Sequence, residues 1–311
     1  MKVYNNFLIN PDAFRIPQYN ISPFSTEWVH RNATLQQQFA PQEIKDLSLQ
    51  LWGEHLYTSS GKTAIAAVLK QYNLSPNDEV YITTTTENTY ISSCVTREIE
   101  KFCKWSRTLT NHTKLIFVNH EFGTTHKNVR GLLDLGLPII EDRAMSMLSI
   151  DKNLQTGNFG DFTVYSLPKF FPIQAGGIIQ INNQAAIQVL LEKDPIVEEY
   201  LGKLVPHFLS EIDTIKKRRW ENYLLFSKLL EPLGFYPELD LEQERDVPSV
   251  YMFHAENMDL NGLKAFMQKN GVEASVFYGR DAFFIPVHQY LTPTDVTFIA
   301  SLIQYYFNEN K

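Results

Sequence analysis

Residues 138–177 constrain the fold and the chemistry of this chain more than any other part of the sequence. An apolar run, residues 137–140, stops abruptly at Glu141 and Asp142. A buried parallel strand ends in this way where its carboxyl end opens into a ligand-binding crevice. We therefore predict a strand here, with the Asp142 side chain facing the crevice.

A reactive lysine is predicted in the same stretch. A β-branched and aromatic run, residues 162–165, leads through Ser166 to Lys169, which residues 170–172 follow with two phenylalanines and a proline. Apolar surroundings disfavour a charged ammonium and lower its pKa, which frees the amine to attack a carbonyl carbon. An enzyme that uses pyridoxal 5′-phosphate needs such a lysine to bind the cofactor's aldehyde. It also needs a carboxylate, here Asp142, to keep the pyridine nitrogen protonated.

Residues 57–72 predict a site for a phosphate group. The chain turns through Ser60 and Gly61 into a helix whose apolar residues recur at helical spacing. Free N–H groups of its first turn, the helix dipole and the hydroxyl of Ser60 or Thr63 point at one place, and Gly61 allows close approach. Two alternatives are an ordinary helix cap without a ligand and a nucleotide P-loop, for which Leu56 replaces the required first glycine.

Composition limits the partners and the compartment. A chain of 311 residues, 44% of them apolar, can bury a large core and is long enough for two domains. The net charge of −7 disfavours a nucleic-acid partner, which needs a basic surface. Cys94 and Cys103 suggest neither a disulfide framework nor a metal cluster, and no apolar run is long enough for a membrane span. We expect a cytoplasmic protein without a metal, nucleic-acid or membrane partner.

Five blocks of the sequence resemble, in the same order, the DegT/DnrJ/StrS-type sugar-nucleotide aminotransferases, a branch of the aspartate-aminotransferase superfamily. The blocks are residues 59–64 with 78–80, 118–123, 137–144, 160–177 and 284–296. In the fourth block, Lys169 and Gly176 keep the family's seven-residue spacing between its lysine and a Gly-Gly pair.

The resemblance implies an α/β protein with the PLP-dependent transferase fold type I. Its large domain has a mixed, mostly parallel sheet, and its small C-terminal domain is α+β. We expect an N-terminal arm over residues 1–40, the large cofactor-binding domain over 41–230 and the small domain over 231–311. The arm, rich in Asn, Pro and Gln and without a sustained period, is predicted to be extended.

The resemblance also implies an activity and a set of site residues. It implies transfer of an amino group from an amino acid, L-glutamate, to a keto sugar attached to a nucleotide. The enzyme is expected to be a homodimer that supplies surface polysaccharide or O-antigen assembly. Lys169 and Asp142 are the expected catalytic residues and hold the cofactor. The other expected cofactor contacts are Ser60, Gly61, Lys62, Tyr90, His120 and Ser166. For His120, a purely structural role is an equal alternative.

Three departures from the family favour an alternative function. Met145 replaces a glutamine near the cofactor's phenolic oxygen, Pro168 replaces a hydroxyl residue, and residues 104–113 form a short connection where the family has a further strand. A degenerate member would keep the fold for binding or scaffolding. A sugar dehydratase is a third hypothesis, but such enzymes have histidine where this chain has Lys169. The basic run of residues 216–219 is interpreted as a solvated helix face.

Overall fold

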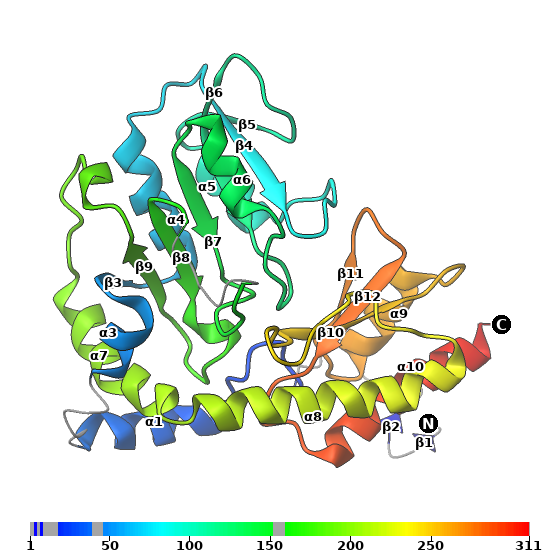
Figure 1. Ribbon diagram of the computed structural model, residues 1–311. Helices are drawn as coiled ribbons and strands as arrows, with labels where there is room; N and C mark the ends of the chain where they lie inside the picture. The colour runs from blue at the N-terminus through cyan, green and yellow to red at the C-terminus, as the bar shows by residue number, and fades with distance from the viewer. Residues whose placement is uncertain (1–2, 5–6, 9–17, 39–45, 152–158, 311) are drawn as a thin grey trace.

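The computed structural model describes residues 3–4, 7–8, 18–38, 46–151 and 159–310. A seven-stranded sheet forms the centre of the larger part of the molecule, with the strand order β3-β9-β8-β7-β6-β4-β5 (Figure 1). Its strands are β3 (His55–Thr58), β4 (Glu79–Thr84), β5 (Lys104–Ser106), β6 (Thr113–Asn119), β7 (Ile139–Asp142), β8 (Phe162–Ser166) and β9 (Gly177–Ile181). Strands β5, β4, β6, β7 and β8 pair in parallel, whereas β9 runs antiparallel to both β8 and β3. This is the mixed, mostly parallel sheet that the sequence predicts.

Helices cover both faces of this sheet because the strands are apolar on both sides. The first face packs on α4 (Gly61–Leu69) and α5 (Ser93–Ile99), in a core to which Phe117 and Val164 contribute. On the other face, α6 (Val129–Leu132) covers β6 and β7. There α3 (Leu47–Trp52) and α7 (Pro195–Leu209) pack on Tyr165 and Ile178.

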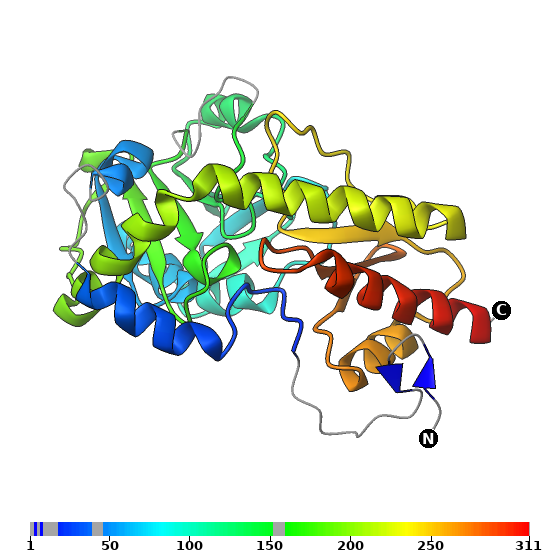
Figure 2. The same ribbon diagram turned by 90° about the horizontal axis from the view of Figure 1, so that it is seen from below.

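The smaller part of the molecule has a three-stranded antiparallel sheet, in the order β10-β12-β11. Its elements are β10 (Val250–His254), β11 (Ser275–Phe277), β12 (Ala282–Pro286), α9 (Leu260–Lys269) and α10 (Pro293–Glu309). The long helix α8 (Ile212–Leu230) runs from the larger part into the smaller one and lies beside α10 (Figures 1 and 2). The second half of α8 therefore belongs to the core of the smaller part, where Tyr223 and Phe226 pack against Tyr251.

Near the N-terminus, the expected extended arm is wrong for part of its length. Residues 27–37 form helix α1 (Glu27–Gln37), and β1 (Val3–Tyr4) pairs with β2 (Phe7–Leu8). The Trp28 ring of α1 lies 4.8 Å from the Tyr290 ring and 6.0 Å from that of Phe208. This tertiary packing stabilises a helix whose sequence shows little amphipathic pattern.

One other local prediction also needs correction. The 104–113 connection, expected to lack a strand, contains β5 at the edge of the sheet. Residues 184–186 form a single 3₁₀ turn, η4 (Gln184–Ala186), and helices α7 and α8 meet near Ser210. No helix in the described ranges is both long and apolar enough to cross a membrane.

Candidate functional site

The carboxyl ends of β6 and β7 lie side by side, with Asn119 opposite Asp142 in the register of the sheet. Because successive side chains of a strand point to opposite faces, alternate residues at these two ends enter different spaces. Asn119 and Asp142 line a cavity of about 840 Å³. Small-domain residues of α9, β11 and β12 also line this cavity.

Most of the site residues predicted from the sequence meet in this cavity. Its lining includes Ser60, Gly61, Lys62, Tyr90, Asp142, Ser166 and Lys169. His120 is absent from the described lining. It lines a second cavity instead, so the structure does not bring His120 to the expected cofactor contact.

The predicted phosphate turn is built by close backbone packing. Ser60 caps helix α4, and its Oγ accepts a hydrogen bond of 3.2 Å from the Thr63 N–H. A Cβ on Gly61 would lie 3.1 Å from the Cβ of Ser166. A Cβ on Gly177 would lie only 2.5 Å from the carbonyl carbon of Ser60. Glycines at both positions therefore let the first turn of α4 lie against β8 and β9, next to Ser166.

Asp142 is buried, and only one of its two carboxyl oxygens accepts a hydrogen bond from the described residues. Its Oδ1 accepts a hydrogen bond of 2.9 Å from the Ala144 N–H. Its Oδ2 accepts none from the described residues, although the side chain lines the cavity. Burial raises the pKa of Asp142 to about 6, against the opposing effects of the Ala144 N–H and of the nearby Lys169 charge. A cationic group in the cavity would therefore find a poorly solvated carboxylate.

Side chains from distant segments hold the loop that carries Lys169. They donate to four backbone carbonyls of residues 168–172, which leaves this loop little freedom. The pairs are Ser22 Oγ with Pro168 (2.7 Å), Arg219 Nη2 with Lys169 (2.9 Å), Gln289 Nε2 with Phe170 (2.8 Å) and Asn32 Nδ2 with Pro172 (2.9 Å). Lys169 itself is half-buried.

Arg219 overturns the expectation that the whole basic run is solvated. Lys217 and Arg218 are exposed, but Arg219 is fully buried. Its guanidinium donates to the carbonyls of Lys169 and Pro248, and its Cζ lies 4.5 Å from the Phe170 ring centroid. Burial lowers the pKa of Arg219 to about 9, which still leaves it charged at neutral pH. The sequence gives no signal for this role, because a basic run on a helix is usually exposed.

His120 forms a buried pair with Glu141 behind the cavity. Its Nδ1 accepts from the His126 N–H at 2.9 Å, so the proton is on Nε2, which donates to Glu141 at 3.0 Å. Burial lowers the pKa of His120 despite this bond. Burial alone would raise the pKa of Glu141, but the hydrogen bond from His120, the charge of Arg143 and the Gly160 N–H lower it. The pair is therefore a neutral imidazole and a carboxylate.

Sequence reasoning missed several residues at the rim and wall of the cavity. The Tyr90 ring lies 5.4 Å from the ring of Tyr278, and Lys264 lies over that second ring at 5.6 Å. Glu121 is a buried carboxylate, and both the N–H and the hydroxyl of Thr86 donate to its Oε2. Only Glu121 had a signal, because it lies within one of the recognised blocks, residues 118–123. Tyr278 and Lys264 come from the small domain and are far away in sequence.

A family model described as "Putative PLP-dependent aminotransferase" matches residues 49–201, just under half of the chain. Among proteins with curated descriptions, none matches. Solved structures do match, and one is the aminotransferase TlmJ from Streptoalloteichus hindustanus. Its TM-score is 0.74 at 13% identity, covering 96% of this chain and 100% of that chain.

Two further structures are similar. The apo-form of the putative sugar aminotransferase Spr1654 from Streptococcus pneumoniae has a TM-score of 0.72 at 15% identity, with 96% and 98% coverage. A DegT DnrJ EryC1 StrS aminotransferase from Brucella abortus has a TM-score of 0.68 at 15% identity, with 90% and 96% coverage. The expected fold type I architecture is thus confirmed, and the family model confirms the expected resemblance to PLP-dependent aminotransferases.

Proposed function

We propose that this chain is a PLP-dependent aminotransferase that moves an amino group from an amino acid to a keto sugar. One observation carries the proposal. A single cavity collects a buried carboxylate, Asp142, a lysine, Lys169, and the N-terminal turn of α4 at Ser60 and Gly61. These are the three features that a pyridoxal phosphate site requires, and they come from segments far apart in the sequence.

The residues present fit the cofactor. The unengaged Oδ2 of Asp142 suits a protonated pyridine nitrogen, and burial of the carboxylate strengthens such a contact. The turn at Ser60 and Gly61, together with Lys62 and Ser166, would hold the phosphate, since the free N–H groups of a helix's first turn attract anions. When bound, pyridoxal phosphate supplies an aldehyde that condenses with amines and a ring that accepts electrons.

Lys169 and Asp142 would then have separate roles in proton transfer. Lys169 Nζ would attach the cofactor and would also take the proton from the substrate carbon that bears the nitrogen. The carbonyl contacts of the Lys169 loop position this amine. Asp142 would hold a proton on the ring nitrogen, because its carboxylate would stabilise the positive charge there.

Within this activity we propose L-glutamate as the amino donor and a keto sugar attached to a nucleotide as the acceptor. A cation of the cavity, Lys264, suits the phosphates of a nucleotide, and the rings of Tyr90 and Tyr278 offer a surface for its base. We keep the expectations of a homodimer, of the cytoplasm and of a place in surface polysaccharide or O-antigen assembly as parts of this proposal. Tyr90 stays the proposed aromatic contact of the cofactor.

An absorbance spectrum of the purified protein with added pyridoxal phosphate tests the activity. We expect a visible band in the wild type that Lys169→Ala lacks and that shifts to the ultraviolet when L-glutamate is added, with release of 2-oxoglutarate. The matched control is Lys62→Ala, which should keep the band but need more cofactor to reach it. A wild-type protein without a lysine-dependent band at saturating cofactor would contradict the proposal.

The alternative of a non-catalytic binding protein rests on Met145. This side chain lines the cavity and packs with an apolar cluster around Ile21 and Val250, so it cannot donate a hydrogen bond to the cofactor's phenolic oxygen. The short 104–113 connection no longer supports this alternative, because β5 is present. A protein that binds pyridoxal phosphate through Lys169 but shows no change with any amino acid would favour it.

A further inference from the structure

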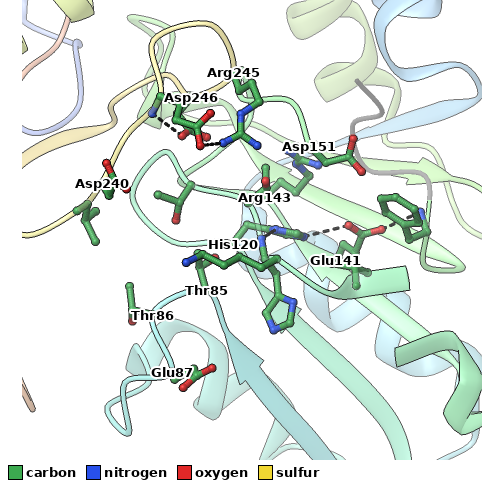
Figure 3. A pocket seen from close by; sticks show the side chains of 18 of the residues that line it. Thr85, Thr86, Glu87, His120, Glu141, Arg143, Asp151, Asp240, Arg245 and Asp246 are labelled. Atoms are coloured by element: carbon green, nitrogen blue, oxygen red, sulfur yellow. Dashed lines mark hydrogen bonds and ion pairs between the residues drawn. The ribbon is translucent and has the colours of Figure 1, made fainter. Parts of the chain in front are cut away.

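A second cavity of about 630 Å³ lies on the other side of the same strand ends (Figure 3). Glu141 and Arg143 line it, whereas Asp142 and Ala144, which alternate with them in sequence, line the cofactor cavity. The other walls come from residues 124–130 after β6 and from residues 238–246, the segment that leads to β10. The two cavities are therefore back to back.

Arg143 brings a buried hydrogen-bond donor without a partner to this second cavity. Its side chain is 1% exposed, and Nη2 donates to the Ser149 carbonyl at 2.8 Å. Its Nε is buried and has no hydrogen-bond partner, and the guanidinium forms no ion pair with any carboxylate of the described residues. A buried charged donor left without an acceptor is costly, which points to an acceptor from outside the chain.

The buried acid Glu141 does not serve as that acceptor. Glu141 already accepts three hydrogen bonds, from His120 Nε2 and from the N–H groups of Phe159 and Gly160. It compensates Arg143 electrostatically, as the lowered pKa of Glu141 shows, but without a direct contact. The Nε–H group of Arg143 is therefore still without an acceptor among the described residues.

Two of the acids that line the cavity pair with arginines of the same wall, and two others, Asp151 and Asp246, are buried. Glu238 pairs with Arg280 at 2.9 Å, and Glu242 pairs with Arg245. Glu87 and Asp240 are exposed at the mouth, where water screens their charges. Lys127 and Arg130 also line the cavity, and neither is in an ion pair with a described residue.

We propose that this second cavity binds the oxyanion group, a carboxylate or a phosphate, of a small metabolite, with Arg143 as the buried contact. A planar guanidinium with a free Nε matches either oxyanion, and the cavity's volume suits a small molecule. Lys127 and Arg130 would attract the anion at the rim. The site is distinct from the cofactor's, because the two cavities share no described lining residue and Arg143 lines only this one.

The test uses the full chain saturated with pyridoxal phosphate, so that the cofactor's own phosphate site is filled. Crystals are soaked in sodium selenate, whose anomalous scattering locates the anion directly. We expect selenate within hydrogen-bonding distance of Arg143 Nε. The proposal would be overturned if selenate bound only elsewhere in the crystal, or did not bind at all.

Thermal unfolding of the same protein distinguishes the two sources of the oxyanion. Inorganic phosphate and acetate are titrated at constant ionic strength, and at least one is expected to raise the melting temperature in a saturable way, because a ligand that binds only the folded state stabilises it. A shift with phosphate indicates a phosphate group as the natural ligand's oxyanion, and a shift with acetate indicates a carboxylate. Arg143→Gln should lose the shift, and Arg218→Gln, an exposed arginine on α8, should keep it. A flat response to both anions in the wild type, or an unchanged shift in a folded Arg143→Gln protein, contradicts the site. If Arg143→Gln does not fold, the selenate position in the wild type decides.

Discussion

The buried negative charge of Asp142 lowers the stability of the cofactor-free protein. Its pKa of about 6 lies above the ordinary value of 3.8, so the folded chain binds this proton more tightly than the unfolded chain does. Its contribution to stability is therefore greatest below pH 3.8 and falls as the pH rises to about 6. Two pKa units correspond to roughly 3 kcal/mol, an upper limit for one group. Asp142→Asn should thus stabilise the cofactor-free protein at pH 7 by up to that amount, while it weakens cofactor binding.

Urea unfolding of the cofactor-free proteins at pH 7 and pH 4 measures this difference. The asparagine amide keeps the acceptor for the Ala144 N–H, so the main change is the lost charge. The gain in stability should shrink toward zero at pH 4, where the wild-type carboxyl is protonated. An equal effect at both pH values would mean that packing, rather than desolvation of the charge, sets the stability at this residue.

Arg219 is the residue whose removal should be most costly. Arg219→Met leaves the carbonyls of Lys169 and Pro248 and the Gln289 side chain without their donor, so we expect a loss of roughly 3–5 kcal/mol in the free energy of unfolding. The matched control is Arg218→Met, one residue earlier and exposed, which should change stability by less than about 0.5 kcal/mol. Chemical denaturation measures both. A loss no larger than that of the control would show that the Lys169 loop is held by its other contacts.

Individual site residues were predictable where a local motif carries them. Lys169, Asp142 and Ser60 lie in short recognisable stretches, and the structure places all three in one cavity. His120 was misplaced because the side of a strand that a residue faces depends on register, and a shift of one residue reverses it. Arg219 was missed for a different reason: its partners are backbone carbonyls, which no sequence pattern reveals.

At the scale of elements, the contact of β9 with the first turn of α4 shapes the predicted phosphate site. Gly177→Ala would place a methyl group 2.5 Å from the carbonyl carbon of Ser60, so the turn must move. We expect a loss of about 1–3 kcal/mol in stability and weaker cofactor binding. The control is Gly202→Ala on helix α7, where a Cβ meets nothing within 4 Å and should stabilise by up to about 1 kcal/mol. Unchanged cofactor affinity in Gly177→Ala would remove this turn from the phosphate site.

Elements with strong periodicity or a continuous apolar run were predicted, and those that depend on tertiary packing were not. Strand β7 and helix α4 follow from such patterns. Helix α1 depends on contacts of Trp28 with the rings of Phe208 and Tyr290. The sequence of the helix itself does not indicate these contacts. The three-residue strand β5 is fixed by its pairing with β4 at the sheet edge.

At the scale of the whole molecule, two loops join the large and small domains beside the cofactor cavity. The Asn88 side chain after β4 donates to the Tyr278 carbonyl at 2.8 Å, and Arg280 donates to the Thr86 carbonyl. Gly279, with φ of +91°, lets its backbone pass close to Asn88, since a Cβ there would lie 2.4 Å from Asn88 Oδ1. These contacts hold the rings of Tyr90 and Tyr278 together at the rim, so they set how closely the two domains approach.

Asn88→Ala should therefore loosen the domains without unfolding either one. The Tyr278 carbonyl loses a buried donor, which costs about 1–3 kcal/mol, and the loss should appear locally because the cores of the two domains are untouched. We expect faster amide hydrogen exchange at residues 278–280 and a higher KM for L-glutamate in the cofactor-loaded enzyme. Asn310→Ala, which removes an exposed contact within the last turn of α10, should change neither. Unaltered exchange at residues 278–280 would mean that α8, which runs through both domains, fixes their relative position by itself.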